Sequence, residues 1–480
     1  MSRFPIFLVL ALLALPAAAQ QVLSAPAPPP SELDAKLAGE SDLPTLHALV
    51  ARFRSQGDHA AEASAWKRLS QLRPHLGQYK YELAATYARQ DEKSLAYSAL
   101  LELQQQGYAF DPRGDRRFTP VTTTEVWDHI LKALDVNREP FGEGEVVHTL
   151  PAEDLLLESL AWDPTRKQLL VGSAREGKVY LLDDRGRLKP LVAASAENGL
   201  WAVFDLAVDA ERGVLWVAST AVPHYKGYKA ESDLGRAGIF KFDLKSGKFL
   251  KSYLSPTVIG QSFFMSSLAL APDGTVYAAD GVNNAVYAVR DDKLRRLFHN
   301  PVLGGIRGLA VSGDGAILYL ADFERGLFGF ELKTGKPFEV GVPKSLALGG
   351  IEGLFWWKDH LIVVQNGMQP RRIMRLGLAP GGRSIASVQP LAAGQPALSM
   401  PSQGTLAGDA VYVIANSQKL QYDRFGLPRD RTRLEGARVY RVAADWALAD
   451  ATQPAALPRS PLTPAPALQH APPAPRRDDG

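Results

Sequence analysis

Glu158-Ser159-Leu160-Ala161-Trp162-Asp163 opens a pattern that recurs along most of this 480-residue chain. The later copies lie at residues 206–209, 268–274, 309–315, 353–356 and 404–409. Each copy leads into a second apolar segment, at residues 169–173, 215–219, 276–280, 318–322, 361–365 and 411–415. A repeat of about 40–60 residues with several short strands per unit is typical of a β-propeller. Six copies predict six blades.

The rest of each repeat fits a four-stranded blade. Third strands are predicted at residues 178–182, 238–243, 285–289, 327–331, 372–376 and 438–442, and outer strands follow, as at 249–254 and 293–299. The last repeat has no fourth strand after it. Residues 144–150 alternate like a strand and precede the first repeat. We therefore expect them to supply the outer strand of the last blade, which closes a propeller over residues 144–446.

Residues 32–137 have a helical period instead. Leu46, Val50 and Phe53 share one predicted helix face, and Trp66 and Leu69 map onto positions 100 and 103 at an offset of about 34 residues. That offset is the tetratricopeptide (TPR) period. The fold class predicted is thus mainly β, a six-bladed β-propeller with an N-terminal α-helical TPR-like module. Such a module binds a protein or peptide partner, although a plain helical bundle without a binding role remains open.

Both ends of the chain differ in composition from the rest. Residues 1–19 combine Arg3, a short apolar core and Ala17-Ala18-Ala19, which predicts a signal peptide. Residues 20–31 resemble a Pro/Ala-rich linker, and residues 453–480 a disordered Pro/Ala-rich tail. We expect a periplasmic or secreted protein without a membrane span, because the apolar core is too short for one.

Composition excludes several chemistries. The chain has no cysteine, so thiolate ligands and cysteine nucleophiles are absent. A formal net charge of +3 argues against nucleic acid as a partner. Nine histidines are scattered without metal-ligand spacing, and neither a serine-hydrolase elbow nor a phosphate-binding loop is present.

The candidate site follows from the repeat. Residues before each inner strand should converge at one mouth of the channel, and the aligned positions are Glu158, Phe204, Ser266, Arg307, Glu352 and Gln403. A second ring should follow each second strand, at Ser173, Ser219, Asp280, Asp322, Gln365 and Ala415, with Asn366 and Asn416 adjacent. Two long insertions, 220–237 and 416–436, should lean over Glu158. Charged groups in a narrow mouth are costly to desolvate unless they are paired or bound to something.

The segment Glu158-Ser159-Leu160-Ala161-Trp162 resembles the first-blade motif of the SMP-30/gluconolactonase/luciferin-regenerating-enzyme-like propellers. The resemblance covers roughly residues 145–445 and implies a metal-dependent hydrolase of lactones or esters. It implies a calcium or zinc ion held by a Glu in the first blade, an Asn in the fourth and an Asp in the fifth. Glu158 matches the first ligand, and Glu352 is a conservative replacement for the Asp.

Arg307 stands where the resemblance requires the Asn. An arginine cannot ligate a cation or lose its charge. Three interpretations follow: a site for a polar small molecule, a metal site of Glu158 and Glu352 with Arg307 turned away, or an ion-pair network that fills the channel. The first predicts an exported binding protein whose site also includes Ser266, Gln403, Asp280, Asp322, Gln365, Asn366 and Asn416. The second predicts the metal-dependent hydrolase.

Overall fold

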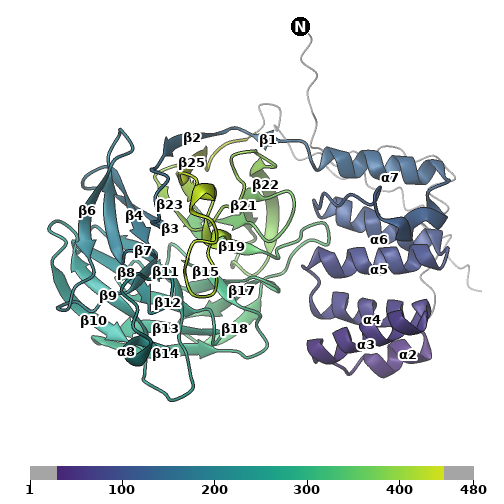
Figure 1. The fold of residues 1–480 in the computed structure, drawn as a ribbon, viewed down its shortest axis with the longest axis horizontal. Coiled ribbons are helices and arrows are strands. Elements are labelled where there is room, and N and C mark those ends of the chain that lie inside the picture. Colours follow the sequence, from purple (N-terminus) through teal and green to yellow (C-terminus); the bar gives the residue numbers. More distant parts are fainter. Residues whose placement is uncertain (1–29, 448–480) are drawn as a thin grey trace, which may run out of the picture. The chain divides into compact units, whose positions relative to one another are not determined.

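The computed structural model describes residues 30–447, which form an N-terminal helical part followed by six β-sheets (Figure 1). The predicted signal peptide at 1–19 and the predicted tail at 453–480 lie outside the described residues, as does most of the linker at 20–31. None of the helices within residues 30–447 is long and apolar enough to cross a membrane.

The helical part is built from short antiparallel hairpins. In chain order it contains α2 (Glu32–Leu37), α3 (Leu43–Gln56), α4 (His59–Leu72), α5 (Gly77–Arg89), α6 (Lys93–Gln105), the 3-10 helix η1 (Arg116–Val121) and α7 (Glu125–Val136). Asp42 and Asp58 cap α3 and α4, each accepting a hydrogen bond from an amide three residues on. Gly57, with φ of 69°, ends α3 and allows the sharp turn into α4. The same pair of helices recurs after 34 residues, from residue 43 to 77 and from 59 to 93.

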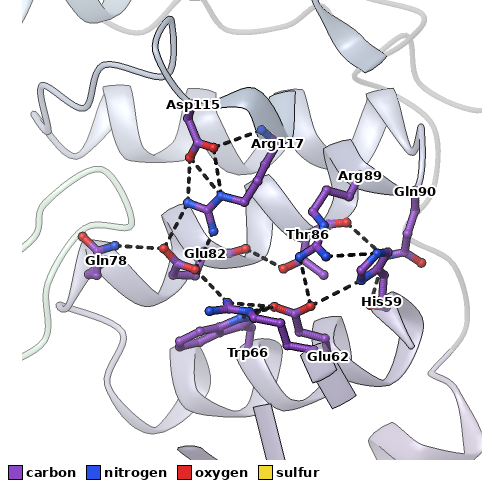
Figure 2. Close-up of polar contacts among 11 residues, drawn as sticks. His59, Glu62, Trp66, Gln78, Glu82, Thr86, Arg89, Gln90, Asp115 and Arg117 are labelled. Atoms are coloured by element: carbon purple, nitrogen blue, oxygen red, sulfur yellow. Dashed lines mark hydrogen bonds and ion pairs between the residues drawn. The ribbon is translucent and has the colours of Figure 1, made fainter. Parts of the chain in front are cut away.

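A network of ion pairs joins these hairpins (Figure 2). Glu62 on α4 is fully buried and accepts hydrogen bonds from Arg54 on α3 at 2.8 Å and Arg89 on α5 at 3.3 Å. Glu82 on α5 pairs with the same Arg54 and with Arg117 of η1. Because a buried carboxylate is costly unless it is paired, these contacts fix the helices against one another.

Five of the six sheets contain four antiparallel strands and the fifth sheet in chain order contains five, which confirms the predicted six-bladed propeller. From the inner strand outward, the first blade contains β3 (Leu157–Asp163), β4 (Gln168–Ser173), β5 (Lys178–Leu182) and β6 (Leu188–Ala193), and the second contains β7 (Ala202–Asp209), β8 (Val214–Thr220), β9 (Ala237–Asp243) and β10 (Phe249–Leu254). The third contains β11 (Met265–Leu270), β12 (Val276–Asp280), β13 (Ala285–Arg290) and β14 (Lys293–His299), and the fourth contains β15 (Ile306–Val311), β16 (Ile317–Asp322), β17 (Gly326–Glu331) and β18 (Lys336–Glu339). The fifth contains β19 (Ile351–Trp357), β20 (His360–Gln365), β21 (Arg372–Leu378) and β22 (Ile385–Ala393), and the sixth contains β23 (Gly404–Ala407), β24 (Ala410–Ile414), β25 (Arg438–Ala443) and β2 (Gly144–Thr149). Apolar side chains pack between neighbouring sheets; Phe240 and Phe242 of β9, for example, share a cluster with Leu170 and Val179 of the first blade.

The ring is closed by pairing of the two ends of the propeller sequence. Strand β2 pairs with β25, with Val146 opposite Tyr440, and this confirms the expected outer strand of the last blade. A two-residue strand that the sequence did not predict, β1 (Phe141–Gly142), extends the fifth sheet by pairing with β22. This pairing covers the edge of β25 that would otherwise be unpaired.

The helical part contacts the loops of the fourth and fifth blades. The guanidinium of Arg372 is buried and donates to the carbonyl oxygens of Gln106, after α6, and of Ala347, before β19. Arg73, after α4, forms an ion pair of 2.8 Å with Glu324 of the fourth blade. Ala347 and Met368 belong to the same apolar cluster as Leu100 and Phe118 of the helical part.

Ring closure can be tested by Gly144→Ala. A Cβ added at Gly144 would overlap the buried ring of Tyr440 on β25, so we expect the free energy of unfolding in urea to fall by about 1–3 kcal/mol. Gly114→Ala is the matched control, because nothing lies within 4 Å of its Cβ position, and it should change stability by less than about 0.5 kcal/mol. Equal effects of the two substitutions would contradict the packing of β2 on β25.

Candidate functional site

Each of the first five inner strands contains one extra residue at its mouth end. The register against the second strand slips at that residue, so two residues oppose one, as in a β-bulge. The extra residues are Glu158, Phe204, Ser266, Arg307 and Glu352. A bulge turns the unpaired residue out of the alternating pattern, and all five of these side chains line one cavity.

That cavity has a volume of about 310 Å³ and lies at the mouth of the channel. Gln403 completes the ring from the residue before β23, so the structure brings together all six predicted first-ring residues. The remaining lining residues come from loops and are Leu156, Val222, His224, Phe264, Ser402 and Lys419. The two insertions expected over Glu158 supply Val222, His224 and Lys419, and the second of them is the yellow segment before β25 in Figure 1.

Glu158 is the buried acid of the cavity. The hydroxyl of Ser417 donates a hydrogen bond of 2.6 Å to its Oε1. Burial raises the pKa of the Glu158 carboxyl to about 7, even though the nearby charge of Lys419 and the Ser417 hydrogen bond act to lower it; the negative charge of Glu352 adds to the rise. A carboxyl with this pKa exchanges a proton near neutral pH.

Glu352 is held by two cations. Nζ of Lys419, in the 3-10 helix η2 (Lys419–Gln421), lies 3.3 Å from its Oε1. Nη1 of Arg307 lies 3.8 Å from the same oxygen. Because Lys419 reaches Glu352 from the sixth-blade insertion and also acts on Glu158, it sits within Coulombic range of both carboxyl groups.

Arg307 faces the cavity and is incompletely paired. Its guanidinium carbon lies 5.6 Å from the centroid of the Phe323 ring, a cation–π distance. Its Nε is buried and has no hydrogen-bond partner among residues 30–447.

One wall of the cavity is apolar. The rings of Phe204 and Phe264 lie 4.6 Å apart, and Leu156 and Val222 line the cavity beside them. His224 lies on the same rim, and burial, assisted by the charge of Arg175, lowers its pKa. The cavity therefore combines charged groups with an apolar surface.

Ser266 and Gln403 line the cavity, but parts of their side chains are occupied. The Ser266 hydroxyl donates to the carbonyl oxygen of Ile306 at 3.1 Å. The Gln403 amide donates to the carbonyl oxygen of Arg307 at 2.9 Å, which ties the sixth blade to the fourth. These contacts hold the ring in place.

The predicted second ring does not line the cavity, and this part of the prediction is corrected. Asp280 is buried and accepts from the amides of Phe264 and Asn283. Asp322 is buried and accepts from the amides of Gly304, Gly305, Glu324 and Arg325. Both carboxylates stand at strand ends, where free backbone amides need acceptors, so their role is to order the adjacent loops.

The amides of the second ring are used in the same way. Gln365 donates to the carbonyl oxygens at 347 and 349, and Asn366 to that of Pro401. Asn416 donates to Gly436 and accepts from the amide of Arg438, so it closes the base of the insertion. Ser173 and Ser219 likewise bond to backbone groups. Strand alternation located these residues correctly, but it could not show that loop backbone would use them.

A second cavity of about 310 Å³ runs along the inner strands and is also lined by Gln403. Its acidic residue is Asp205, whose carboxylate accepts from the amides of Leu206 and Leu268. The bond from the Leu268 amide links the second blade to the third. Asp205 is therefore occupied in holding the blades together.

The calcium or zinc ion that the resemblance implies does not fit the first cavity. No group of three or more His, Asp or Glu side chains within residues 30–447 is arranged to hold a metal ion. Glu158 and Glu352, the two predicted ligands, share the cavity with the ammonium of Lys419 and the guanidinium of Arg307. Two fixed cations beside two carboxylates leave no charge to attract a third.

Sequence reasoning missed Lys419, Ser417 and Ser402. Ser417 and Lys419 lie in the insertion after β24, which was expected near the site because of its length, and Ser402 directly precedes the predicted Gln403. Among the basic residues of the insertion, nothing in the sequence distinguishes Lys419 from Arg424 or Arg429.

The chain matches no protein-family model, and no curated protein matches its sequence. Among solved structures it is similar to a gluconolactonase from Xanthomonas campestris, with 14% identity and a TM-score of 0.40, over 62% of this chain and 89% of that chain. It is also similar to a PQQ-bound aldose sugar dehydrogenase from Streptomyces coelicolor (17%, 0.40, 63% and 100%). A third is luciferin-regenerating enzyme (15%, 0.43, 64% and 95%). At these values the likeness assigns no activity, so function has to be argued from the cavity itself.

Proposed function

We propose that the cavity at the propeller mouth binds a small molecule that carries an anionic group beside an apolar portion. The observation that carries the proposal is the guanidinium of Arg307, which lines the cavity, is 38% exposed and lies 3.8 Å from its carboxylate partner Glu352. A carboxylate or phosphate oxygen would accept hydrogen bonds from its exposed nitrogens, and a guanidinium binds such groups with particular strength.

The charge balance of the cavity supports an anion. Arg307 and Lys419 are positive, Glu352 is negative, and Glu158 is protonated below about pH 7. These four groups then carry a formal charge of +1. Phe204 and Phe264, whose rings are tilted by 50° to each other, offer an apolar wall for the remainder of the ligand.

The near-neutral pKa of Glu158 favours a second candidate, hydrolysis of a lactone or carboxylic ester without a metal ion. The ionised carboxylate would accept a proton from the attacking water and return it to the leaving alkoxide. Arg307 would stabilise the negative oxygen that forms on the carbonyl carbon.

The helical part would recruit a protein or peptide as a TPR-like module. Support comes from the 34-residue recurrence of the α3–α4 hairpin as α5–α6. Because an export signal is also expected at residues 1–19, we propose a periplasmic or secreted binding protein with one small-molecule site and one partner-binding part.

Arg307→Met tests the anion site. Phenylacetate and phenyl phosphate should raise the melting temperature of the wild-type protein, whereas phenylacetamide, which lacks the charge, should not. The substitution removes the guanidinium at similar length, so affinity measured by calorimetry should fall at least about tenfold. Arg295→Met, on the exposed strand β14, should leave affinity unchanged. Equal binding of the amide and the carboxylate would contradict the proposal.

The pH dependence of binding tests the role of Glu158. As pH rises through about 7, Glu158 ionises and the formal charge of the four groups falls from +1 to zero. Affinity for phenyl phosphate should therefore drop by about threefold to tenfold between pH 6 and pH 8, beyond the change caused by ionisation of the ligand itself. Glu158→Gln keeps the shape and removes the titration, so its profile should follow the ligand alone. A wild-type profile identical to that of Glu158→Gln would rule out this role.

Turnover of δ-valerolactone and p-nitrophenyl acetate tests the second candidate. If the cavity catalyses hydrolysis, activity should survive a chelator and fall by about 100-fold or more in Glu158→Gln. Activity that appears only with added calcium or zinc would contradict the conclusion that the cavity does not hold a metal ion. If the protein binds the ligands but does not hydrolyse these substrates, hydrolysis is excluded and only the binding function remains.

A further inference from the structure

Exposed large apolar side chains gather on the face of the propeller that contains the mouth. In each antiparallel blade the loops between second and third strands, and between one blade and the next, lie at the same end of the sheets. Of the thirteen large apolar residues that are exposed within residues 30–447, eight lie in these loops: Leu234, Val258, Ile259, Val282, Val302, Leu420, Phe425 and Leu427. Ile259 is as exposed as it would be in an extended chain, at 103%.

The loops that carry these residues are neighbours. The amide of Phe263 donates to Gly235, which connects the loop of Ile259 to that of Leu234. Gln261 donates to Asn283 at 3.1 Å, and Asn284 donates to the carbonyl oxygen of Leu303 at 2.6 Å. On the other side, Gly426 packs against the backbone of residues 223–224. The apolar side chains therefore form an arc on adjoining loops.

Charge along this arc is divided sharply. The three loops at residues 255–264, 281–284 and 300–305 contain no Asp, Glu, Lys or Arg, although they carry four of the apolar residues. The two loops that adjoin the arc on one side carry a small excess of basic residues. Residues 416–436 contain five Lys or Arg against three acids, and residues 221–236 contain three against two.

We infer that this face docks on a phospholipid surface with anionic head groups. Apolar tips on uncharged loops can enter the head-group region without desolvating a charge. Lys and Arg on the adjoining loops attract anionic lipids, and their long side chains reach the head groups while the apolar tips insert. The apolar residues stand on separate loop tips, an arrangement that suits a deformable lipid surface.

Vesicle binding tests this inference. The full chain should co-sediment with phosphatidylcholine vesicles that contain about one third phosphatidylglycerol, and more weakly with phosphatidylcholine alone or in high salt. The triple variant Ile259→Ser/Phe425→Ser/Leu427→Ser should lower the partition coefficient at least about tenfold, because three apolar side chains are withdrawn. All three positions are exposed, so the variant should unfold at the wild-type temperature.

The control is Val136→Ser/Leu250→Ser/Val388→Ser, which removes three apolar residues that are 38–49% exposed from α7, β10 and β22. It should bind vesicles as the wild type does. All variants share the apolar stretch at residues 7–15, so any binding by that stretch would be the same in each of them. Equal loss in both triple variants, or no binding by the wild type to either vesicle, would overturn the inference. So would a concentration-dependent dimer that is lost only in the first variant, because the arc would then be an interface between copies.

Discussion

One unpaired residue at the mouth end of each of the first five inner strands determines what this propeller can do. In a regular strand these positions would alternate between the packed faces of the blade. The bulge instead turns Glu158, Arg307 and Glu352 toward a common space. Closure of the ring by β2 and β25 fixes the distance between these residues, so both the fold and the site depend on the same six sheets.

The charges of the mouth stabilise one another without being fully matched. Lys419 lies within reach of both carboxyl groups, whereas Arg307 keeps one buried donor free among the described residues. The same side chain stacks near Phe323, whose neighbour Glu324 pairs with Arg73 of the helical part.

Much of the fold could be predicted because the sequence of each blade repeats the same local pattern. Alternation and turn residues marked the strands, and the missing outer strand of the last blade pointed to residues 144–150. The first ring was found because it occupies one register position in every repeat. The bulges themselves have no sequence signature, so the direction of Arg307 could not be derived. Strand β1 was missed because Phe141–Gly142 is only two residues long.

The second ring shows where the pattern ceases to be informative. Asp280 and Asp322 occupy equivalent positions and look like site residues, yet both accept hydrogen bonds from loop amides. Lys419 occupies no repeat position, yet it contacts Glu352 at 3.3 Å. Long-range pairing of loops decides both outcomes, and it depends on backbone geometry that one sequence does not specify.

The most direct test of this account is the titration of Glu158, observed by carbon NMR of the glutamate carboxyl groups. In the wild-type protein one resonance should titrate near pH 7 and should be absent from Glu158→Gln. This result would show that burial of Glu158 in the cavity outweighs the nearby charge of Lys419, so that the acid is largely neutral below about pH 7. If every glutamate titrated at its ordinary value of about 4.3, the acid would be solvated, and an anion-binding cavity at the mouth would be contradicted.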